Sequence, residues 1–205
     1  MWAAGLAAGV GLVAYWRVAR TGFILLGVGV AVLIGGAGAL AGTGWWGAFG
    51  CAAALLAIYL RTNRWTSLPL AAATLLWLEA AHPVWSWLVL ASGALGLGAI
   101  TTEMMLGHWY LVDPKLPRWP LRALAVIGVA GIAIDTGLVQ VLRVTDPAIS
   151  PVVLVGLGAT SLVLMVAVWF ALKGRSYTGV MAATGLSYLA VLTSLGAVVL
   201  GRAVL

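Results

Sequence analysis

The sequence predicts an all-α integral membrane protein, a polytopic bundle of about eight transmembrane helices arranged as four hairpins. Two features of composition lead to this prediction. Hydrophobic residues make up 63% of the chain and charged residues only 8%, whereas soluble domains carry roughly a quarter charged residues. The third observation is that apolar stretches near the ~20 residues of a transmembrane helix alternate with short polar ones. We expect a single transmembrane domain over residues 1–205, because no polar stretch is long enough to form a soluble domain.

The eight expected helices follow one another with only short breaks. Polar or proline-containing stretches such as RTNRWTSLP (residues 61–69) and DPKLPR (residues 113–118) mark the breaks, because a proline and the residue before it disfavour continuation of a helix. The first and fourth helices are the shortest. The expected spans are residues 2–17, 22–42, 45–61, 67–82, 86–112, 121–142, 149–172 and 178–201.

The basic residues predict the orientation of these helices. Segments that follow odd-numbered helices hold nine of the 11 Lys and Arg residues, and segments that follow even-numbered helices hold two. Because cytoplasmic segments of membrane proteins are enriched in Lys and Arg, we expect both chain ends outside the cytoplasm and the protein in the cytoplasmic (inner) membrane. The nine are Arg17, Arg20, Arg61, Arg64, Lys115, Arg118, Arg122, Lys173 and Arg175, and the two are Arg143 and Arg202.

The odd-numbered helices also end alike, with aromatic residues just before basic ones, as in AYWRVAR (residues 14–20) and VWFALKGR (residues 168–175). Duplication of one helical hairpin would explain this pattern. The general preference of membrane interfaces for aromatic and basic residues would explain it equally, and both explanations stay open. The 27 glycines predict close helix packing, since small residues let helices approach one another in lipid.

Glu103 is the most prominent candidate for a functional group. It lies seven residues before Tyr110, at the expected interface, and therefore roughly 10 Å inside the hydrocarbon. Ionisable side chains at such depth are costly and commonly mark proton or ion paths. On a helix Glu103 shares one face with Gly107 and Tyr110, whereas His108 shares another face with Thr101. The candidates for a proton or ion path, or for a binding site, are therefore Glu103, Tyr110, His108 and Thr101.

Each of these residues also has a structural interpretation. Glu103 could be neutral, or paired with an arginine, and hold helices together. His108 lies beside a tryptophan and a tyrosine at headgroup level, where amphipathic rings collect without any further function.

Asp135 is the second acid inside an expected helix. It lies about seven residues before the outer end of the sixth span, whereas Glu103 lies in the cytoplasmic half of the fifth. We therefore expect the two acids at different depths, as two stations of one path rather than as a contacting pair. Polar lining would come from Thr102, Thr136 and Gln140.

A second candidate cluster consists of Glu79 and His82, in LEAAHP (residues 78–83) near the outer end of the fourth helix. Residues at i and i+3 of a helix are neighbours, so these two side chains could form a local hydrogen bond. A purely interfacial role is the alternative, as for His108.

The sequence argues against several cofactors and activities. Cys51 is the single cysteine, so neither a disulfide framework nor a thiolate metal site is expected. His82 and His108 flank the fifth span on opposite sides and cannot share a haem. The motifs HExxH, CxxC and GxSxG do not occur. We expect no metal and no tightly bound cofactor, with quinone as the one cofactor left open, and a role that is not enzymatic.

Partners and function follow from the same features. The formal net charge of +6 comes from basic residues scattered between apolar spans, which favours anionic lipids at the cytoplasmic face over nucleic acid as partners. The first hypothesis is translocation of a proton, ion or small solute through the bundle by an intramembrane carboxylate. The alternative is a non-catalytic membrane subunit of a larger complex, such as a respiratory, quinone-linked one. A membrane-protein partner or a homo-oligomer is compatible with both, and a lipid-modifying enzyme ranks last because no nucleophile and base are paired.

Overall fold

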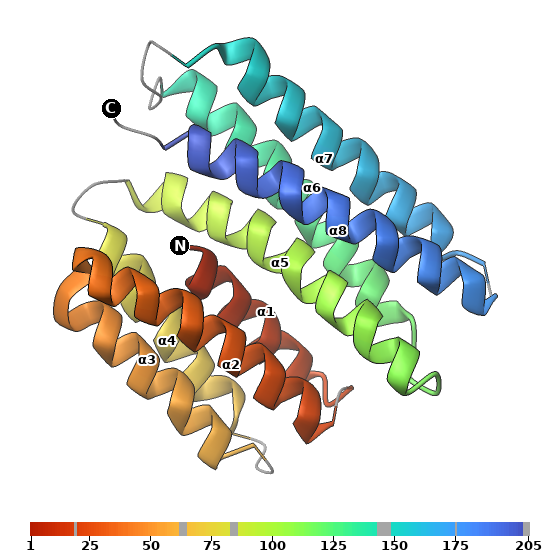
Figure 1. Cartoon of the computed structure of the whole chain (residues 1–205), viewed down its shortest axis with the longest axis horizontal. Coiled ribbons are helices and arrows are strands. Elements are labelled where there is room, and N and C mark those ends of the chain that lie inside the picture. The colour runs from red at the N-terminus through yellow and green to blue at the C-terminus, as the bar shows by residue number, and fades with distance from the viewer. Residues whose placement is uncertain (19, 62–64, 83–85, 143–148, 175, 203–205) are drawn as a thin grey trace. The chain divides into compact units, whose positions relative to one another are not determined.

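The computed structural model describes residues 1–18, 20–61, 65–82, 86–142, 149–174 and 176–202 (Figure 1). Within these residues the chain forms eight α-helices and one π-helical segment, η1. The prediction of an all-α chain with eight helices is confirmed. The elements are α1 (Trp2–Tyr15), α2 (Thr21–Gly38), η1 (Ala39–Thr43), α3 (Gly44–Tyr59), α4 (Ser67–Ala81), α5 (Trp87–Val112), α6 (Trp119–Val141), α7 (Pro151–Ala171) and α8 (Tyr177–Leu200).

Local sequence explains where several helices begin. Pro120 and Pro151 lie in the first turns of α6 and α7, where the missing proline N–H removes no helical hydrogen bond. Ser176 caps α8, because its hydroxyl accepts a hydrogen bond from the N–H of Gly179 at 3.2 Å. Between α2 and α3 the chain reverses without a separate loop. Gly42 and Gly44 make this possible, since their φ angles of 114° and 63° lie in the region that favours glycine.

Five segments in the described part of the chain are long and apolar enough to cross a membrane: α2 with most of η1 (Thr21–Gly42), α5, α6, α7 and α8. A multi-span membrane protein is therefore supported by length and composition. The helices α1, α3 and α4 are apolar but only 14 to 16 residues long, or about 21–24 Å at 1.5 Å per residue, against a hydrocarbon core of about 30 Å.

We expected all eight helices to span the membrane, and in the described part of the chain five of them are long enough to do so. That α1, α3 and α4 also cross stays a prediction, and so do the orientation of the chain ends and the choice of membrane. Three of the basic residues behind the orientation, Arg64, Arg143 and Arg175, lie outside the described residues.

The chain divides into two compact units, residues 1–94 and residues 95–205; the expectation of a single domain stays a prediction. In the first unit α1 packs against α2 and α4, and α3 also packs against α2 and α4. The four helices therefore form a closed ring of neighbours, red to yellow in Figure 1. Between α1 and α4, the Thr74 hydroxyl donates a hydrogen bond to the carbonyl of Ala4 at 3.2 Å.

Trp77 of α4 is the central packing residue of this first unit. It is 4% exposed, and its indole N–H donates to the carbonyl of Gly47 in α3 at 3.1 Å. Glycine is required on both sides of the ring: a Cβ on Gly50 would lie 2.5 Å from the indole nitrogen, and a Cβ on Gly35 of α2 would also overlap the ring. The small residues expected at helix contacts therefore make room here for one large aromatic side chain.

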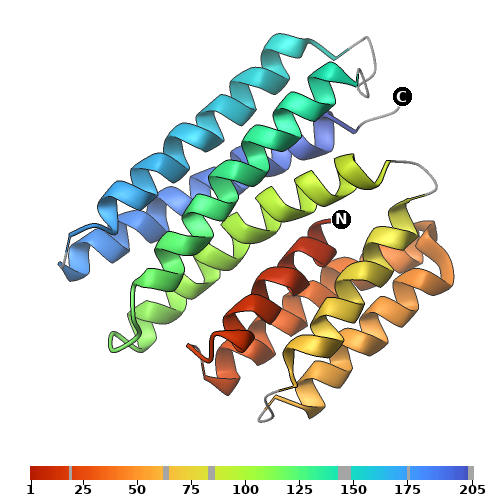
Figure 2. The same cartoon turned by 180° about the vertical axis from the view of Figure 1, so that it is seen from behind.

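The second unit contains most of α5 together with α6, α7 and α8. The helices α6 and α7 pack together, as do α7 and α8. The helices α5 and α6 run side by side (Figure 2), and their backbones lie close together at Gly96 and Gly131, where a Cβ on Gly96 would lie 2.8 Å from the backbone nitrogen of Ile132. Contacts between α5 and α8 at Glu103 and Gly107 close the ring, so the four helices of each unit follow the same order of neighbours.

Candidate functional site

Glu103 is fully buried in α5, with 0% of its surface exposed. Its carboxyl oxygen Oε2 forms a hydrogen bond with the hydroxyl of Ser187 in α8. In the described part of the chain the other oxygen, Oε1, has no hydrogen-bond partner. Of the five candidate spans, α5 has the largest buried share: 78% of an 18-residue stretch of α5 is buried, against 28–39% in the other four.

The sequence of α8 explains why a hydroxyl meets this acid. Its buried positions recur every three or four residues, the spacing of one helix face, and they include Val180, Thr184, Ser187, Val191, Ser194 and Val198. Small polar residues thus replace larger apolar ones at three levels of the buried face. Such residues bring membrane helices close and form hydrogen bonds between them.

The hydrogen bonds of Ser187 bear on the protonation state of Glu103. The Ser187 hydroxyl contacts both the Glu103 carboxyl and the carbonyl of Ala183, the latter at 2.8 Å. A hydroxyl carries one hydrogen and can also accept. Both contacts are therefore satisfied at once if the carboxyl is protonated and donates to Ser187, which in turn donates to Ala183. The geometry fits an uncharged Glu103.

Gly107 lies one helical turn beyond Glu103 and faces the same helix, α8. A Cβ on Gly107 would lie 2.5 Å from the hydroxyl oxygen of Thr184, so Thr184 occupies the space that the missing side chain of Gly107 leaves free. The Thr184 hydroxyl donates to the carbonyl of Val180 at 2.9 Å. Glu103 with Ser187 and Gly107 with Thr184 therefore form two adjacent levels of one tight contact between α5 and α8.

Tyr110 is the third residue of the predicted Glu103 face, and its side chain is 5% exposed. Its hydroxyl accepts a hydrogen bond from Nε of Arg118 at 3.2 Å, and the Arg118 guanidinium lies 5.6 Å from the ring centroid. Arg118 also donates to the carbonyl of Gly174, between α7 and α8. Tyr110 thus helps to fasten the α5–α6 connection to the α7–α8 connection, a role that the sequence did not reveal.

The other polar candidates near Glu103 contact their own helix or are exposed. The hydroxyls of Thr101 and Thr102 donate to the carbonyls of Leu97 and Gly98, each at 2.7 Å, and both residues are buried. His108 is exposed. The structure therefore brings Glu103 together with Ser187, and not with His108 or Thr101.

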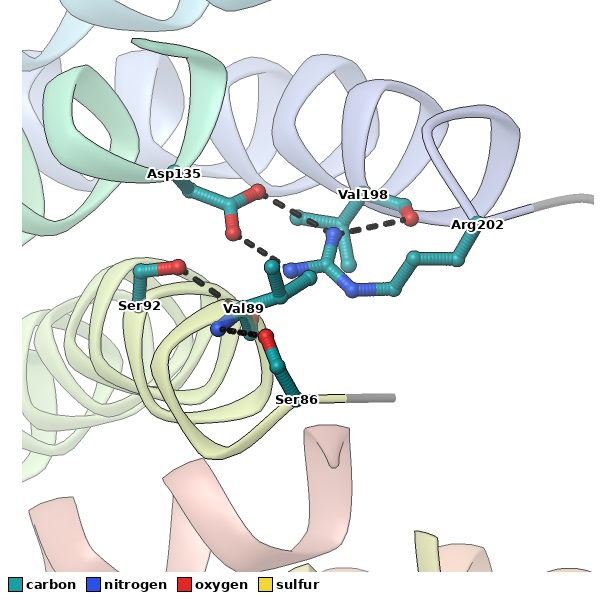
Figure 3. Close-up of polar contacts among 6 residues, drawn as sticks. All are labelled: Ser86, Val89, Ser92, Asp135, Val198 and Arg202. Carbon is teal, nitrogen blue, oxygen red and sulfur yellow. Dashed lines mark hydrogen bonds and ion pairs between the residues drawn. The ribbon is translucent and has the colours of Figure 1, made fainter. Parts of the chain in front are cut away.

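Asp135 of α6 forms an ion pair with Arg202, just beyond the end of α8 (Figure 3). The guanidinium nitrogens Nη1 and Nη2 lie 3.2 Å and 2.5 Å from Oδ2 and Oδ1, and Nη1 also donates to the carbonyl of Val198 at 3.2 Å. Both side chains are almost fully buried, with 5–6% exposed. Sequence reasoning treated Arg202 only as a topology signal, although the predicted orientation places Arg202 and the C-terminal end of α6 on the same side of the membrane.

Glu103 and Asp135 contact widely separated positions along α8 and its C-terminal end. Their partners Ser187 and Arg202 are 15 residues apart, and 15 residues of helix span roughly 22 Å at 1.5 Å per residue.

The second candidate cluster, Glu79 and His82, lies in the first unit, where the backbone N–H of His82 donates to the backbone carbonyl of Glu79 at 3.1 Å. The His82 ring stacks on Trp87 with a centroid distance of 4.9 Å.

Comparison with known proteins leaves the function to be argued from this geometry. No protein-family model, no curated protein and no solved structure matches the chain. In the described part of the chain, no three His, Cys, Asp or Glu side chains gather as they would to hold a metal ion. The arrangement that remains is a buried carboxyl between two helices, hydrogen-bonded to a hydroxyl. Such a group can take up and release a proton.

Proposed function

We propose that this chain is a multi-span membrane protein that passes protons through its second helical unit, with Glu103 as the group that binds and releases them. The observation that carries the proposal is the environment of the Glu103 carboxyl. It is completely buried in an apolar helix, and in the described part of the chain its hydrogen-bond partner is a hydroxyl rather than a basic side chain. Acidic residues inside membrane-spanning segments commonly mark proton relays.

The contacts of this acid favour a proton over a larger cation. A metal cation requires several oxygen ligands around it. In the described part of the chain Ser187 is the one side chain that forms a hydrogen bond with Glu103, and Thr184 fills the space beside Gly107, so too few oxygens converge there for a metal cation. A proton needs only one acceptor at a time, and the Ser187 hydroxyl can both accept and donate it.

The test is proton flux into liposomes that contain the purified protein and a trapped pH-sensitive dye, driven by a potassium diffusion potential. We expect the wild type to acidify the lumen and Glu103→Gln to reduce the rate to that of protein-free liposomes, because glutamine keeps the shape and a hydrogen bond but cannot titrate. The matched control is Glu79→Gln, the same change in the half-buried acid of α4, which should leave the flux unchanged.

Two outcomes would contradict the proposal. Full flux in Glu103→Gln would show that Glu103 only holds α5 and α8 together. Wild-type liposomes no more permeable than protein-free ones would remove translocation altogether and favour a subunit of a larger membrane complex, for which copurification of a partner from native membranes is the direct measurement.

A further inference from the structure

A second polar feature of the second unit lies where α6 begins and α7 ends. Trp169 of α7 contacts two cations: the Arg122 guanidinium of α6 lies 5.4 Å from its ring centroid, and the Lys173 ammonium lies 3.9 Å from it. The Lys173 ammonium also lies 4.7 Å from the ring of Phe170. We call Arg122, Trp169, Phe170 and Lys173 the Trp169 cluster.

The cluster holds two exposed positive charges close together. Arg122 and Lys173 are exposed at their positions, and in the described part of the chain neither forms an ion pair with an acid. Ring contacts orient a cation but leave its net charge in place. Two like charges held beside one indole repel each other, and an anion placed between them would relieve this repulsion while both side chains are already positioned for it.

The position of the cluster indicates the class of anion. It lies in the first turn of α6 and at the last residues of α7, the ends of two helices that are long and apolar enough to span a membrane. Lipid phosphates lie at this level around a spanning helix, and aromatic rings collect there. One face of α7 exposes the apolar side chains of Val163 and Val166 together with Phe170 of the cluster, and acyl chains can pack along it.

We infer that the Trp169 cluster binds the headgroup phosphate of an anionic phospholipid, with the lipid's acyl chains along the exposed face of α7. The inference is independent of proton translocation, because none of its residues contacts Glu103. It assigns to Arg122 and Lys173 a specific lipid site in place of a general role in topology.

The experiment is native mass spectrometry of the full chain in detergent, titrated with phosphatidylglycerol or with phosphatidylcholine of the same acyl chains. We expect the wild type to bind phosphatidylglycerol in preference. The double variant Arg122→Gln/Lys173→Gln should lose on the order of 30-fold in affinity, as expected for two basic residues near an anionic surface, with phosphatidylcholine binding unchanged. The charge-matched control is Arg61→Gln/Lys115→Gln, at two exposed positions outside the cluster, which should retain wild-type affinity.

Trp169→Leu separates a built site from general attraction. It keeps both charges but removes the ring that they share, so phosphatidylglycerol affinity should fall on the order of threefold. Unchanged affinity in Trp169→Leu, or equal losses in the two double variants, would overturn the site. A competition with inorganic phosphate distinguishes the source of the anion: phosphatidylglycerol should stay bound because its acyl chains contribute, and displacement by phosphate would refute a lipid ligand.

Discussion

The contact between Glu103 and Ser187 predicts an unequal response to mutation that a double-mutant cycle can measure. The two residues do not depend on each other equally. Ser187 keeps a second partner, the carbonyl of Ala183 at 2.8 Å, if Glu103 is removed. Glu103 keeps none in the described part of the chain if Ser187 is removed, because its other oxygen has no hydrogen-bond partner.

The magnitudes follow from this asymmetry. Ser187→Ala leaves a completely buried carboxyl without a partner in the described part of the chain, which costs about 1–3 kcal/mol. The strongest hydrogen bonds measured between membrane helices contribute about 1.7 kcal/mol. We therefore expect Ser187→Ala to lower the free energy of unfolding by about 1–2 kcal/mol. In a Glu103→Leu background the same change should cost less than about 0.5 kcal/mol, because no carboxyl remains to be left unpaired.

The assay is reversible unfolding in mixed micelles of mild detergent and dodecyl sulfate, followed by circular dichroism. The matched control is Ser194→Ala, two turns away on the same buried face of α8, whose hydroxyl donates to the carbonyl of Val191 at 3.1 Å. Its effect should be equal in the wild-type and Glu103→Leu backgrounds. If Ser187→Ala also has equal effects in the two backgrounds, the residues are not coupled and the reasoning about this contact is wrong.

Three further outcomes are expected. Gly131→Ala should lower the free energy of unfolding by about 1–3 kcal/mol, because its Cβ would overlap the backbone of α5, whereas Gly137→Ala meets nothing within 4 Å and should be neutral within about 0.5 kcal/mol. Asp135→Asn should destabilise by about 1–3 kcal/mol, because it weakens a buried ion pair with Arg202, yet should leave proton flux measurable in liposomes. Gly174→Cys, in a cysteine-free background, should resist a membrane-impermeant maleimide in intact cells, and rapid labelling would refute the predicted orientation.

Helix number and bounds could be predicted because they depend on local properties of the chain. Hydropathy, the positions of prolines and the basic stretches between helices can be read from the chain residue by residue. The observed bounds of α5, Trp87–Val112, differ by one residue from the expected 86–112. The break between the second and third helices was expected at residues 43–44, but not its mechanism, since the positive φ angles at Gly42 and Gly44 depend on how the two helices pack.

The partners of the site residues could not be predicted in the same way. Helical periodicity placed Glu103, Gly107 and Tyr110 on one face, but it does not say which helix lies opposite. That α8 supplies Ser187 to Glu103, and that α6 and α8 meet through Asp135 and Arg202, depends on the ring order of the second unit. Small residues are compatible with several such orders, so the sequence alone leaves the neighbour undetermined.

The two buried acids of α5 and α6 have different electrostatic environments. Asp135 accepts hydrogen bonds from two nitrogens of a buried guanidinium, so its charge is balanced and its removal would leave an unpaired cation. That arrangement suits a clamp between α6 and α8. Glu103 meets a hydroxyl that can both donate and accept, and in the described part of the chain no charged side chain pairs with it. A relay needs a group that can exist in both states, and by this criterion the proposed path depends on Glu103, with Asp135 holding together the bundle through which it runs.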